Sequence, residues 1–390
     1  MNPQPEVVIV GVGQQPVGEL WDVSLRDLAV RALRAAREDA AGLRPEAIYV
    51  GNMLAASASH QANLGALISE YSGLAGIAEG VTAEAGEASG AAAIYLAYLA
   101  IRSGLVSCAA VVGVEKVTDV VGSSVESVLA RTLDSDYEAG EGMTTISQAA
   151  LLLQRYMHEN KPPREALAEF PKIAHANAVA NPYAMYRKAI DSAAYMRSGM
   201  VADPLNLFDV APVADGAAAI ILTRRDLLPQ KLAHPAVQLV ASSLISDRLA
   251  LHDRADPLFF GAAAVSVQRA CQSAGMPMSA MDLFEYSDNT TLHAILSLEA
   301  AGLAPRGQGW QLASDGSLAR DGYLPVATMG GHKARGYPLG AAGVYQAVEA
   351  CLQLRAEAGG CQVAGAQRAM VQTLAATGST AVTHILQRLD

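Results

Sequence analysis

The feature that most constrains the fold of this 390-residue chain is a pattern that occurs once in each half of the sequence. The stretch Gly90-Ala-Ala-Ala-Ile-Tyr-Leu-Ala97 matches Gly340-Ala-Ala-Gly-Val-Tyr-Gln-Ala347, with a tyrosine at the same place in both. Each copy is typical of a helix and follows a second helix, a polar turn and a short apolar strand. A chain with such a repeat is expected to contain two copies of one architecture.

The elements around the repeat can be placed from their periodicity. In the first half, a helix is expected at Leu25–Ala35, a strand at Ile48–Gly51, and a further strand after the repeated helix at Ala109–Gly113. In the second half, the corresponding helix and two strands are expected at Ala262–Ser273, Asp282–Glu285 and Ala369–Thr373. Strands that alternate with helices favour mostly parallel sheets covered by helix layers.

Only the first half contains a long segment without a counterpart, at about residues 115–203. It carries the helical stretches Ser147–Met157 and Arg164–Ala180, and a structureless loop of this length would be implausible in a compact domain. We therefore predict an inserted subdomain, of the kind that builds binding sites on a rigid scaffold. The expected domains are residues 1–235, which include the insertion, and residues 236–390.

Composition excludes several classes of function. A net charge of −10 without a Lys/Arg cluster argues against nucleic-acid binding. The longest apolar stretch, Ala91–Ile101, is shorter than the roughly 20 residues of a membrane span, and no signal-peptide pattern is visible. The four cysteines form no C-x-x-C pair and the eight histidines show no metal-ligand spacing. We expect a cytoplasmic α/β protein that holds no metal and binds neither nucleic acid nor membrane.

Both repeated helices follow a turn rich in small residues. Counting back three residues from Gly90 and from Gly340 reaches Glu87 and Tyr337. A helix N-terminus presents unpaired N–H groups and a positive potential, so the internal symmetry places a carboxylate and a phenol at equivalent positions. The pattern fits two interpretations equally: a reactive pair, or a glutamate that offsets the helix dipole and a tyrosine that packs.

Motifs along nearly the whole chain resemble those of one known family. They are Val7–Gly13, Val112–Lys116, Asn181–Ala184, Ala202–Leu205, Asp215–Ala219, Asp282–Gly302, Gly330–Gly343 and Thr377–Thr380. With these motifs the chain resembles the thiolase superfamily, in particular the sterol-carrier-protein-X and archaeal-type thiolases. The resemblance implies two duplicated βαβαβαββ halves in a five-layered α-β-α-β-α arrangement with an inserted loop domain. It also implies a homodimer acting on acyl-CoA thioesters, with coenzyme A as part of the substrate and no tightly bound cofactor.

The catalytic motifs of that superfamily are altered in this chain. The Cys-Ala-Ser-Gly motif of the nucleophile, the His-Asp-Cys-Phe motif and the Gly-His-Pro motif here read Glu87-Ala88-Ser89-Gly90, Ser287-Asp288-Asn289-Thr290 and Gly336-Tyr337-Pro338. A carboxylate cannot replace the thiolate in thioester exchange, because the acyl-carboxylate anhydride would be unstable. Ordinary thiolysis is therefore not expected.

One branch of the superfamily is similar in lacking the cysteine and in carrying a tyrosine where this chain has Tyr337. This branch comprises the thiolase-like aldolases of steroid side-chain degradation. The resemblance implies retro-aldol cleavage of a β-hydroxyacyl-CoA with a small OB-fold/zinc-ribbon partner protein. The branch is expected to carry a second tyrosine at the position of Ser287. Tyr286 is adjacent, but one step along a strand points to the opposite face.

An aldol reaction needs a base and hydrogen-bond donors but no covalent intermediate. Tyr337 is the predicted proton donor and Glu87 the base if burial raises its pKa, with Ser287 and Asn289 as polar donors. The residues predicted to bind substrate are Gly331, His332, Gly336 and Gly378.

Two other functions fit the same sequence. One is a non-catalytic thiolase-like subunit that partners an active thiolase or an OB-fold/zinc-ribbon protein, and the other is an acyl-CoA binding module. The carboxyl and phenol at equivalent helix starts favour aldol chemistry. Basic candidates for the coenzyme A phosphates are Arg164, Lys172, Arg187 and Lys188, and their spacing does not select among them.

Overall fold

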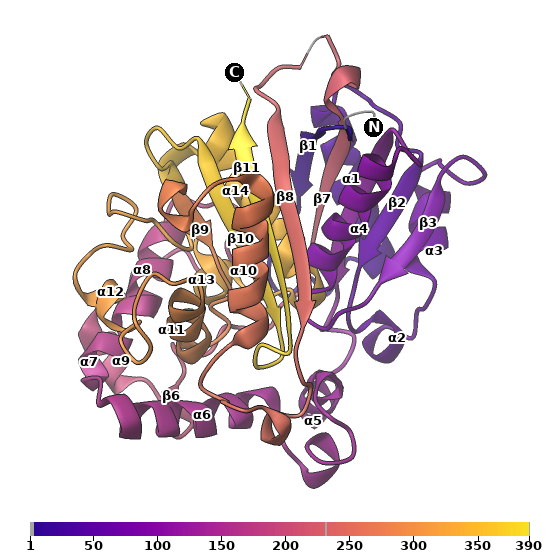
Figure 1. Cartoon of the computed structure of the whole chain (residues 1–390). Helices are drawn as coiled ribbons and strands as arrows, with labels where there is room; N and C mark the ends of the chain where they lie inside the picture. Colours follow the sequence, from indigo (N-terminus) through magenta and orange to yellow (C-terminus); the bar gives the residue numbers. More distant parts are fainter. Residues whose placement is uncertain (1–3, 231, 390) are drawn as a thin grey trace.

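A nine-stranded mixed sheet forms the backbone of the molecule, in the order β3-β2-β4-β7-β1-β8-β11-β10-β9. The structure is a computed structural model and describes residues 4–230 and 232–389 (Figure 1). The strands of the first half lie on one side of the sheet and those of the second half on the other. The two sides join where β1 pairs with β8 from Val7↔Leu239 to Ile9↔Val237. The predicted α/β class with two halves is confirmed.

The strands and helices predicted for the two halves are present, with small changes at their ends. The elements of each half are more numerous than predicted. In the first half they are β1 (Val7–Gln14), α1 (Leu25–Asp39), β2 (Ala47–Gly51), α2 (Ala55–Ala58), α3 (Leu64–Tyr71), β3 (Glu79–Ala83), α4 (Ser89–Ser103), β4 (Cys108–Glu115) and β7 (Gly216–Arg224). In the second half they are β8 (Val237–Ser246), α10 (Gly261–Ala274), β9 (Leu283–Glu285), α11 (Thr291–Ala300), α12 (Gln311–Ser314), α13 (Gly331–Arg335), α14 (Ala342–Arg355), β10 (Arg368–Ala375) and β11 (Thr380–Arg388).

Five layers result from how these helices cover the strands. The outer helix α1 packs on β1 and β7, and its counterpart α10 packs on β8 and β11. Helix α1 is amphipathic, and the Ser24 hydroxyl caps it by accepting the N–H of Asp27 at 3.1 Å. Between the two sets of strands, α4 and α14 pack against each other and are buried on most sides. The predicted α-β-α-β-α arrangement is therefore confirmed.

The insertion leaves the sheet after β4 and returns at β7. It contains α5 (Ser123–Leu129), α6 (Thr145–Asn160), α7 (Arg164–Leu167), α8 (Glu169–Ala178), α9 (Ser192–Arg197), β5 (Met200–Ala202) and β6 (Leu205–Asn206). The helical stretch expected over Arg164–Ala180 is present as two helices, α7 and α8, and it ends at Ala178. The helix breaks at Ala168, because Pro171 has no N–H to donate to the Leu167 carbonyl and can sit only in the first turn of a new helix. Figure 1 shows these elements gathered at one end of the molecule, below the strands.

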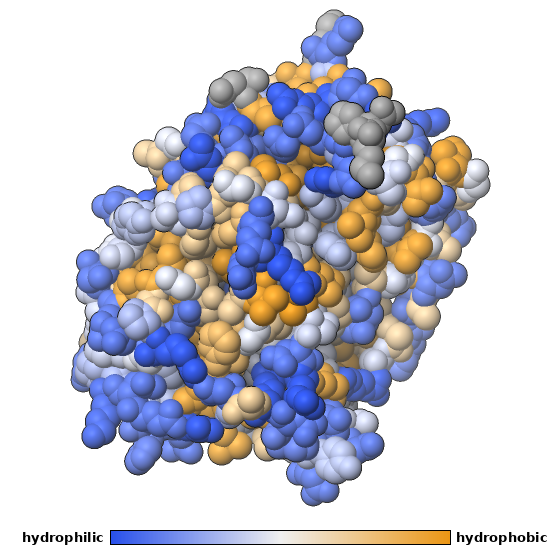
Figure 2. All heavy atoms as spheres, in the orientation of Figure 1, coloured by the Kyte–Doolittle hydropathy of each residue, from blue (hydrophilic) through white to orange (hydrophobic). Residues whose placement is uncertain are grey.

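The face shown in Figure 2 is mainly hydrophilic, with smaller hydrophobic areas over its middle and along the side of β3 and α3. At that side, Tyr71, Ile77 and Val81 are about half exposed. Within the described part of the chain, no helix combines the length and the apolar character needed to cross a membrane.

Candidate active site

The two turns that precede α4 and α14 meet in the middle of the molecule. A Cβ atom at Gly90 would lie 2.8 Å from the carbonyl oxygen of Gly340, so this close approach requires that Gly90 has no side chain. Because the turns touch, Glu87 and Tyr337 come together although they lie far apart in the sequence. Both side chains line one cavity of about 880 Å³.

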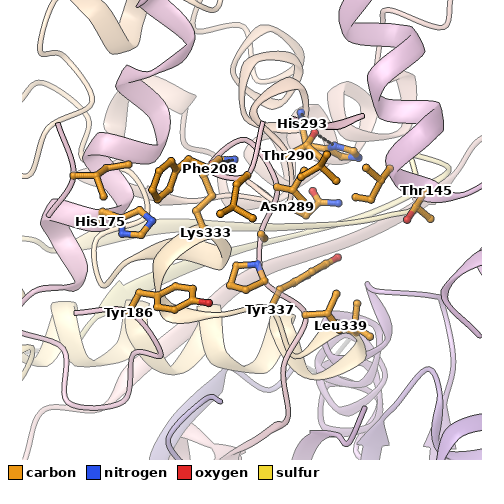
Figure 3. A pocket seen from close by; sticks show the side chains of 18 of the residues that line it. Thr145, His175, Tyr186, Phe208, Asn289, Thr290, His293, Lys333, Tyr337 and Leu339 are labelled. Carbon is orange, nitrogen blue, oxygen red and sulfur yellow. Dashed lines mark hydrogen bonds between the residues drawn. The ribbon is translucent and has the colours of Figure 1, made fainter. Parts of the chain in front are cut away.

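The cavity lies between the insertion and the second half of the chain. The insertion supplies much of its wall, including Val125, Leu129, Thr145, Ile146, His175, Tyr186 and Val201. The second half supplies Asn289, Thr290, His293, Lys333, Tyr337 and Leu339 (Figure 3). Mostly apolar walls with a few convergent polar groups are typical of sites for small molecules.

Glu87 is a buried carboxyl, 4% exposed, held by one main-chain contact. One of its oxygens accepts the N–H of Ala376 at 2.8 Å. Burial raises the pKa of Glu87 above its usual value, because the charged form loses hydration, and the hydrogen bond from Ala376 opposes this shift. A carboxyl with a raised pKa is suited to accept a proton at neutral pH.

Tyr337 presents a phenol to the same cavity. None of the hydrogen bonds among the described residues uses its hydroxyl, which leaves this donor free for a ligand. Burial, together with the negative charges of Glu87 and Asp288, raises the pKa of Tyr337 well above its usual value. The phenol therefore keeps its proton and can act as a donor. Its ring stacks on the imidazole of His332, with the ring centroids 4.6 Å apart.

Asn289 adds a second free polar group to the cavity. Its main-chain carbonyl accepts the N–H of Ala211 at 2.8 Å, which fixes the backbone. Its side-chain Oδ1 is buried and has no partner among the described residues. Buried polar atoms are normally paired, so an unpaired amide in a cavity indicates a group that contacts a ligand.

Ser287 lies elsewhere. Its hydroxyl accepts the N–H of Leu374 at 2.9 Å and donates to the carbonyl of Gln372 at 3.5 Å. These bonds join the chain after β9 to β10, and Ser287 is not among the described residues that line the cavity.

The four residues predicted to bind substrate are likewise not among the described residues that line the cavity. Gly331, Gly336 and Gly378 have φ angles of +53°, +103° and +86°, in the region that favours glycine. A Cβ atom at Gly336 would lie 2.6 Å from the side chain of Val17. His332 is fully buried behind Tyr337, and neither of its ring nitrogens has a hydrogen-bond partner among the described residues.

Comparison with known proteins gives the family. Residues 7–226 match the family description "Thiolase, N-terminal domain", and residues 244–388 match "Thiolase C-terminal domain-like". The chain belongs to the thiolase family. It is 40% identical, over 385 residues, to an acetyl-CoA acetyltransferase of Methanothermobacter thermautotrophicus, covering 98% of this chain and 100% of that protein. It is 29% identical to sterol carrier protein 2 of Bos taurus, covering 76% of this chain and 56% of that protein.

Solved structures confirm the thiolase fold. The structure "Ltp2-ChsH2(DUF35) aldolase" superposes with a TM-score of 0.84 at 21% identity, covering 100% of this chain and 99% of that chain. Human mitochondrial 3-ketoacyl-CoA thiolase superposes with a TM-score of 0.77 at 16% identity, covering 99% of both chains.

This thiolase-family chain has no thiol at its cavity. All four cysteines lie in the described part of the chain, and none of them lines the cavity. Burial raises the pKa of Cys108 and of Cys351 to about 12 each. Their thiols therefore stay protonated and are poor nucleophiles. Within residues 4–230 and 232–389, no group of three or more His, Cys, Asp and Glu side chains could hold a metal ion.

His293 lines the cavity and was not predicted. Its Nε2 donates to the carbonyl of Ala376 at 2.9 Å, and its Nδ1 accepts from the hydroxyl of Thr290 at 2.7 Å. Burial lowers the pKa of His293 to about 4, so the ring is neutral with both nitrogens occupied. His293 therefore fixes Ala376, which in turn holds Glu87. The only signal in the sequence was the threonine three residues earlier, which caps α11.

Lys333 is a second cavity residue that was not predicted. Its Nζ donates to the main-chain carbonyls of Asp209 at 2.5 Å and Phe208 at 3.3 Å. Burial lowers the pKa of Lys333 to about 8. The residue lies within the glycine-rich motif Gly330–Gly343, but nothing in the spacing distinguished it from its neighbours.

The basic residues proposed for the coenzyme A phosphates differ in their positions. Lys188 is exposed and lines the cavity, as does Arg197, which was not predicted. Lys172 forms an ion pair with Glu169 at 2.7 Å. Arg164 donates to the carbonyl of Pro204 at 3.3 Å.

Proposed function

We propose that this thiolase-family protein catalyses aldol-type cleavage or formation of a carbon–carbon bond in a β-hydroxyacyl-CoA, without a covalent acyl-enzyme. The observation that carries this proposal is the pair Glu87 and Tyr337. They provide a proton acceptor and a proton donor on one cavity that no cysteine lines.

In the cleavage direction, Glu87 takes the proton of the β-hydroxyl as the Cα–Cβ bond breaks. The former hydroxyl carbon becomes a carbonyl, and the bonding electron pair stays on Cα as the enolate of the shorter thioester. Tyr337 then protonates Cα, and its phenolate recovers a proton from Glu87, so the enzyme returns to its starting state. The amide of Asn289 donates to the thioester oxygen, where negative charge develops.

Thiolysis is the activity that the printed names of the relatives suggest. Acetyl-CoA acetyltransfer through a thiolase mechanism needs a thiolate nucleophile. In this chain the corresponding motif carries Glu87, and the cysteines are remote from the cavity. The aldolase that superposes on this chain over 100% of its length supports the alternative chemistry.

The test compares two conservative variants with the wild type on a panel of β-hydroxyacyl-CoA thioesters. Tyr337→Phe and Glu87→Gln are each expected to lower kcat by roughly 10²- to 10⁴-fold, the usual contribution of an acid or base. Tyr323→Phe is the matched control, because Tyr323 is 72% exposed and does not line the cavity. Undiminished turnover in Tyr337→Phe, or an acetyl adduct on the protein after incubation with acetyl-CoA, would contradict the proposal.

A non-catalytic subunit is the second candidate, and the lack of a cavity thiol favours it as well. Co-purification with a thiolase that retains its cysteine, together with no turnover of any β-hydroxyacyl-CoA, would support it. The two-protein name of the superposed aldolase supports a different partner, the small OB-fold/zinc-ribbon protein, which we propose for the aldol reaction.

We also propose a homodimer and two domains, residues 1–235 and 236–390. Edge strand β3 is exposed along most of its length, and Val81 within it and Ile77 just before it add exposed apolar area. Exposed apolar side chains next to an unpaired edge favour association. The proposed domain boundary falls between the two family matches, which end at residue 226 and begin at residue 244. Sedimentation velocity and limited proteolysis test these two points.

A further inference from the structure

We infer that Lys333 binds a carboxylate on the acyl group of the substrate, so that the preferred thioesters are those of dicarboxylic acids. This inference rests on the proposed function, because it assigns the substrate class of the same cavity.

The hydrogen bonds of Lys333 leave part of its ammonium group free. The residue is 2% exposed and lies in α13, with its Nζ bonded to the carbonyls of Phe208 and Asp209. An ammonium group carries three hydrogens. The third has no partner among the described residues, and Lys333 lines the cavity. A ligand atom is therefore the acceptor still missing.

No carboxylate oxygen of the described residues lies within ion-pair distance of the Lys333 ammonium, although the charges of the buried Asp209 and Asp288 partly oppose the lowering of its pKa by burial. Both carboxylates already accept from other donors, and Asp209 accepts from Tyr195, Asn206 and Thr291. Asp288 accepts the main-chain N–H of His332 at 2.6 Å. Neither carboxylate accepts from the Nζ of Lys333, and a carboxylate is the acceptor that forms the stronger, charge-assisted bond with an ammonium hydrogen.

The position of Lys333 indicates which end of the acyl group it meets. Figure 3 shows Lys333 beside Phe208 and His175, on the side of the cavity opposite to the hydroxyl of Tyr337. Both side chains line the cavity, and burial together with the positive charge of Lys333 lowers the pKa of His175. The reacting carbon lies between Tyr337 and Glu87, so the partner of Lys333 is a group farther along the acyl chain.

The experiment measures the affinities of glutaryl-CoA and pentanoyl-CoA by isothermal titration calorimetry. The two thioesters have the same chain length and differ by the terminal carboxylate. Neither carries a β-hydroxyl, so neither can undergo the proposed reaction. The wild type is expected to bind glutaryl-CoA at least tenfold more tightly. Lys333→Gln is expected to reduce this ratio to near one by weakening glutaryl-CoA alone.

Lys188→Gln is the matched control. Lys188 is an exposed cation that lines the cavity, and its loss is expected to weaken both thioesters by the same factor because they share coenzyme A. If the wild type binds glutaryl-CoA and pentanoyl-CoA equally tightly, the inference is overturned. This measurement tests the inference even if Lys333→Gln does not fold. Equal weakening of both ligands by Lys333→Gln also overturns it. Failure of the proposed function has a different signature: Tyr337→Phe would keep full turnover while the affinity ratio of the wild type stays high.

Discussion

Helices α4 and α14 are copies of one element, yet they bury different kinds of side chain. The buried residues of α4 are serine, glycine, alanine, isoleucine and tyrosine. Helix α14 also buries Gln346, Glu349, Gln353 and Arg355. The turn before α4 therefore rests on an apolar helix, whereas the turn before α14 rests on a buried polar network. Small residues pack at both turns, but of the two helices only α14 buries charged side chains along its length, Glu349 and Arg355.

Each turn is also held by the opposite half. Glu87 of the first half accepts the N–H of Ala376 in the second half. In return, the carboxylate of Glu115 in the first half accepts the N–H of Gly340 at 3.2 Å and that of Met53 at 3.0 Å. The candidate site therefore forms only when the two halves have packed together.

The largest difference in the cost of a substitution to stability is expected between equivalent positions of α4 and α14. Counted from Gly90 and Gly340, these positions hold Leu99, which is 44% exposed, and the buried Glu349, which lies 3.3 Å from Arg335. Glu349→Ala leaves the guanidinium buried without its partner and is expected to lower the free energy of unfolding by about 3–5 kcal/mol. Leu99→Ala is expected to cost less than about 1 kcal/mol. Urea denaturation of the two variants measures this, and equal losses would contradict the comparison.

A smaller difference in stability is expected between substitutions of Ser287 and Asn289, two neighbours in the second half. Ser287→Ala leaves the buried N–H of Leu374 without an acceptor, at an expected cost of about 1–3 kcal/mol in unfolding free energy. Asn289→Ala removes an unpaired amide, so we expect a stability change within about 0.5 kcal/mol together with a loss of turnover. Unchanged turnover in Asn289→Ala would show that its amide does not contact the substrate.

The matched tyrosines of the repeat provide a finer test. The hydroxyl of Tyr345 donates to the carbonyl of Gln15 at 2.7 Å, whereas Tyr95 is only partly buried. Tyr345→Phe is expected to lower the free energy of unfolding by about 1 kcal/mol, the usual net value of one hydrogen bond. Tyr95→Phe should leave it unchanged, and a comparable loss there would show that the two helices are stabilised alike.

The smallest effect at neutral pH is expected for His384 in β11, whose counterpart β7 contains no histidine. Burial lowers the pKa of His384 from 6.5 to about 3. Between these values the unfolded chain binds a proton that the folded chain does not, so stability decreases as the pH falls from 6.5 to 3. His384→Gln is expected to reduce this loss while changing little at pH 7. Melting temperatures of both proteins across that range measure it, and parallel curves would contradict the prediction.

The sequence predicted a large part of the site because the relevant signals are local. Helix and strand periodicity located the repeated units, and the symmetry of their turns identified Glu87 and Tyr337, which the structure brings to one cavity. The sequence could not show that Asn289 lines the cavity and Ser287 does not. Their different surroundings depend on Leu374 in β10, which bonds Ser287, and on Ala211, which bonds the main chain of Asn289. Such contacts link residues far apart in the chain and leave no periodic pattern.

The duplicated α/β architecture, its element order and the symmetry-related positions of Glu87 and Tyr337 were determined by the sequence alone. Only the tertiary structure decided that His293 supports the Glu87 contact and that Lys333 lines the cavity whereas Gly331, Gly336 and Gly378 do not. The physical reason is the range of the interactions. Secondary structure follows from neighbours within a few residues, whereas the direction of a buried polar side chain is set by hydrogen-bond partners contributed by the other half of the chain.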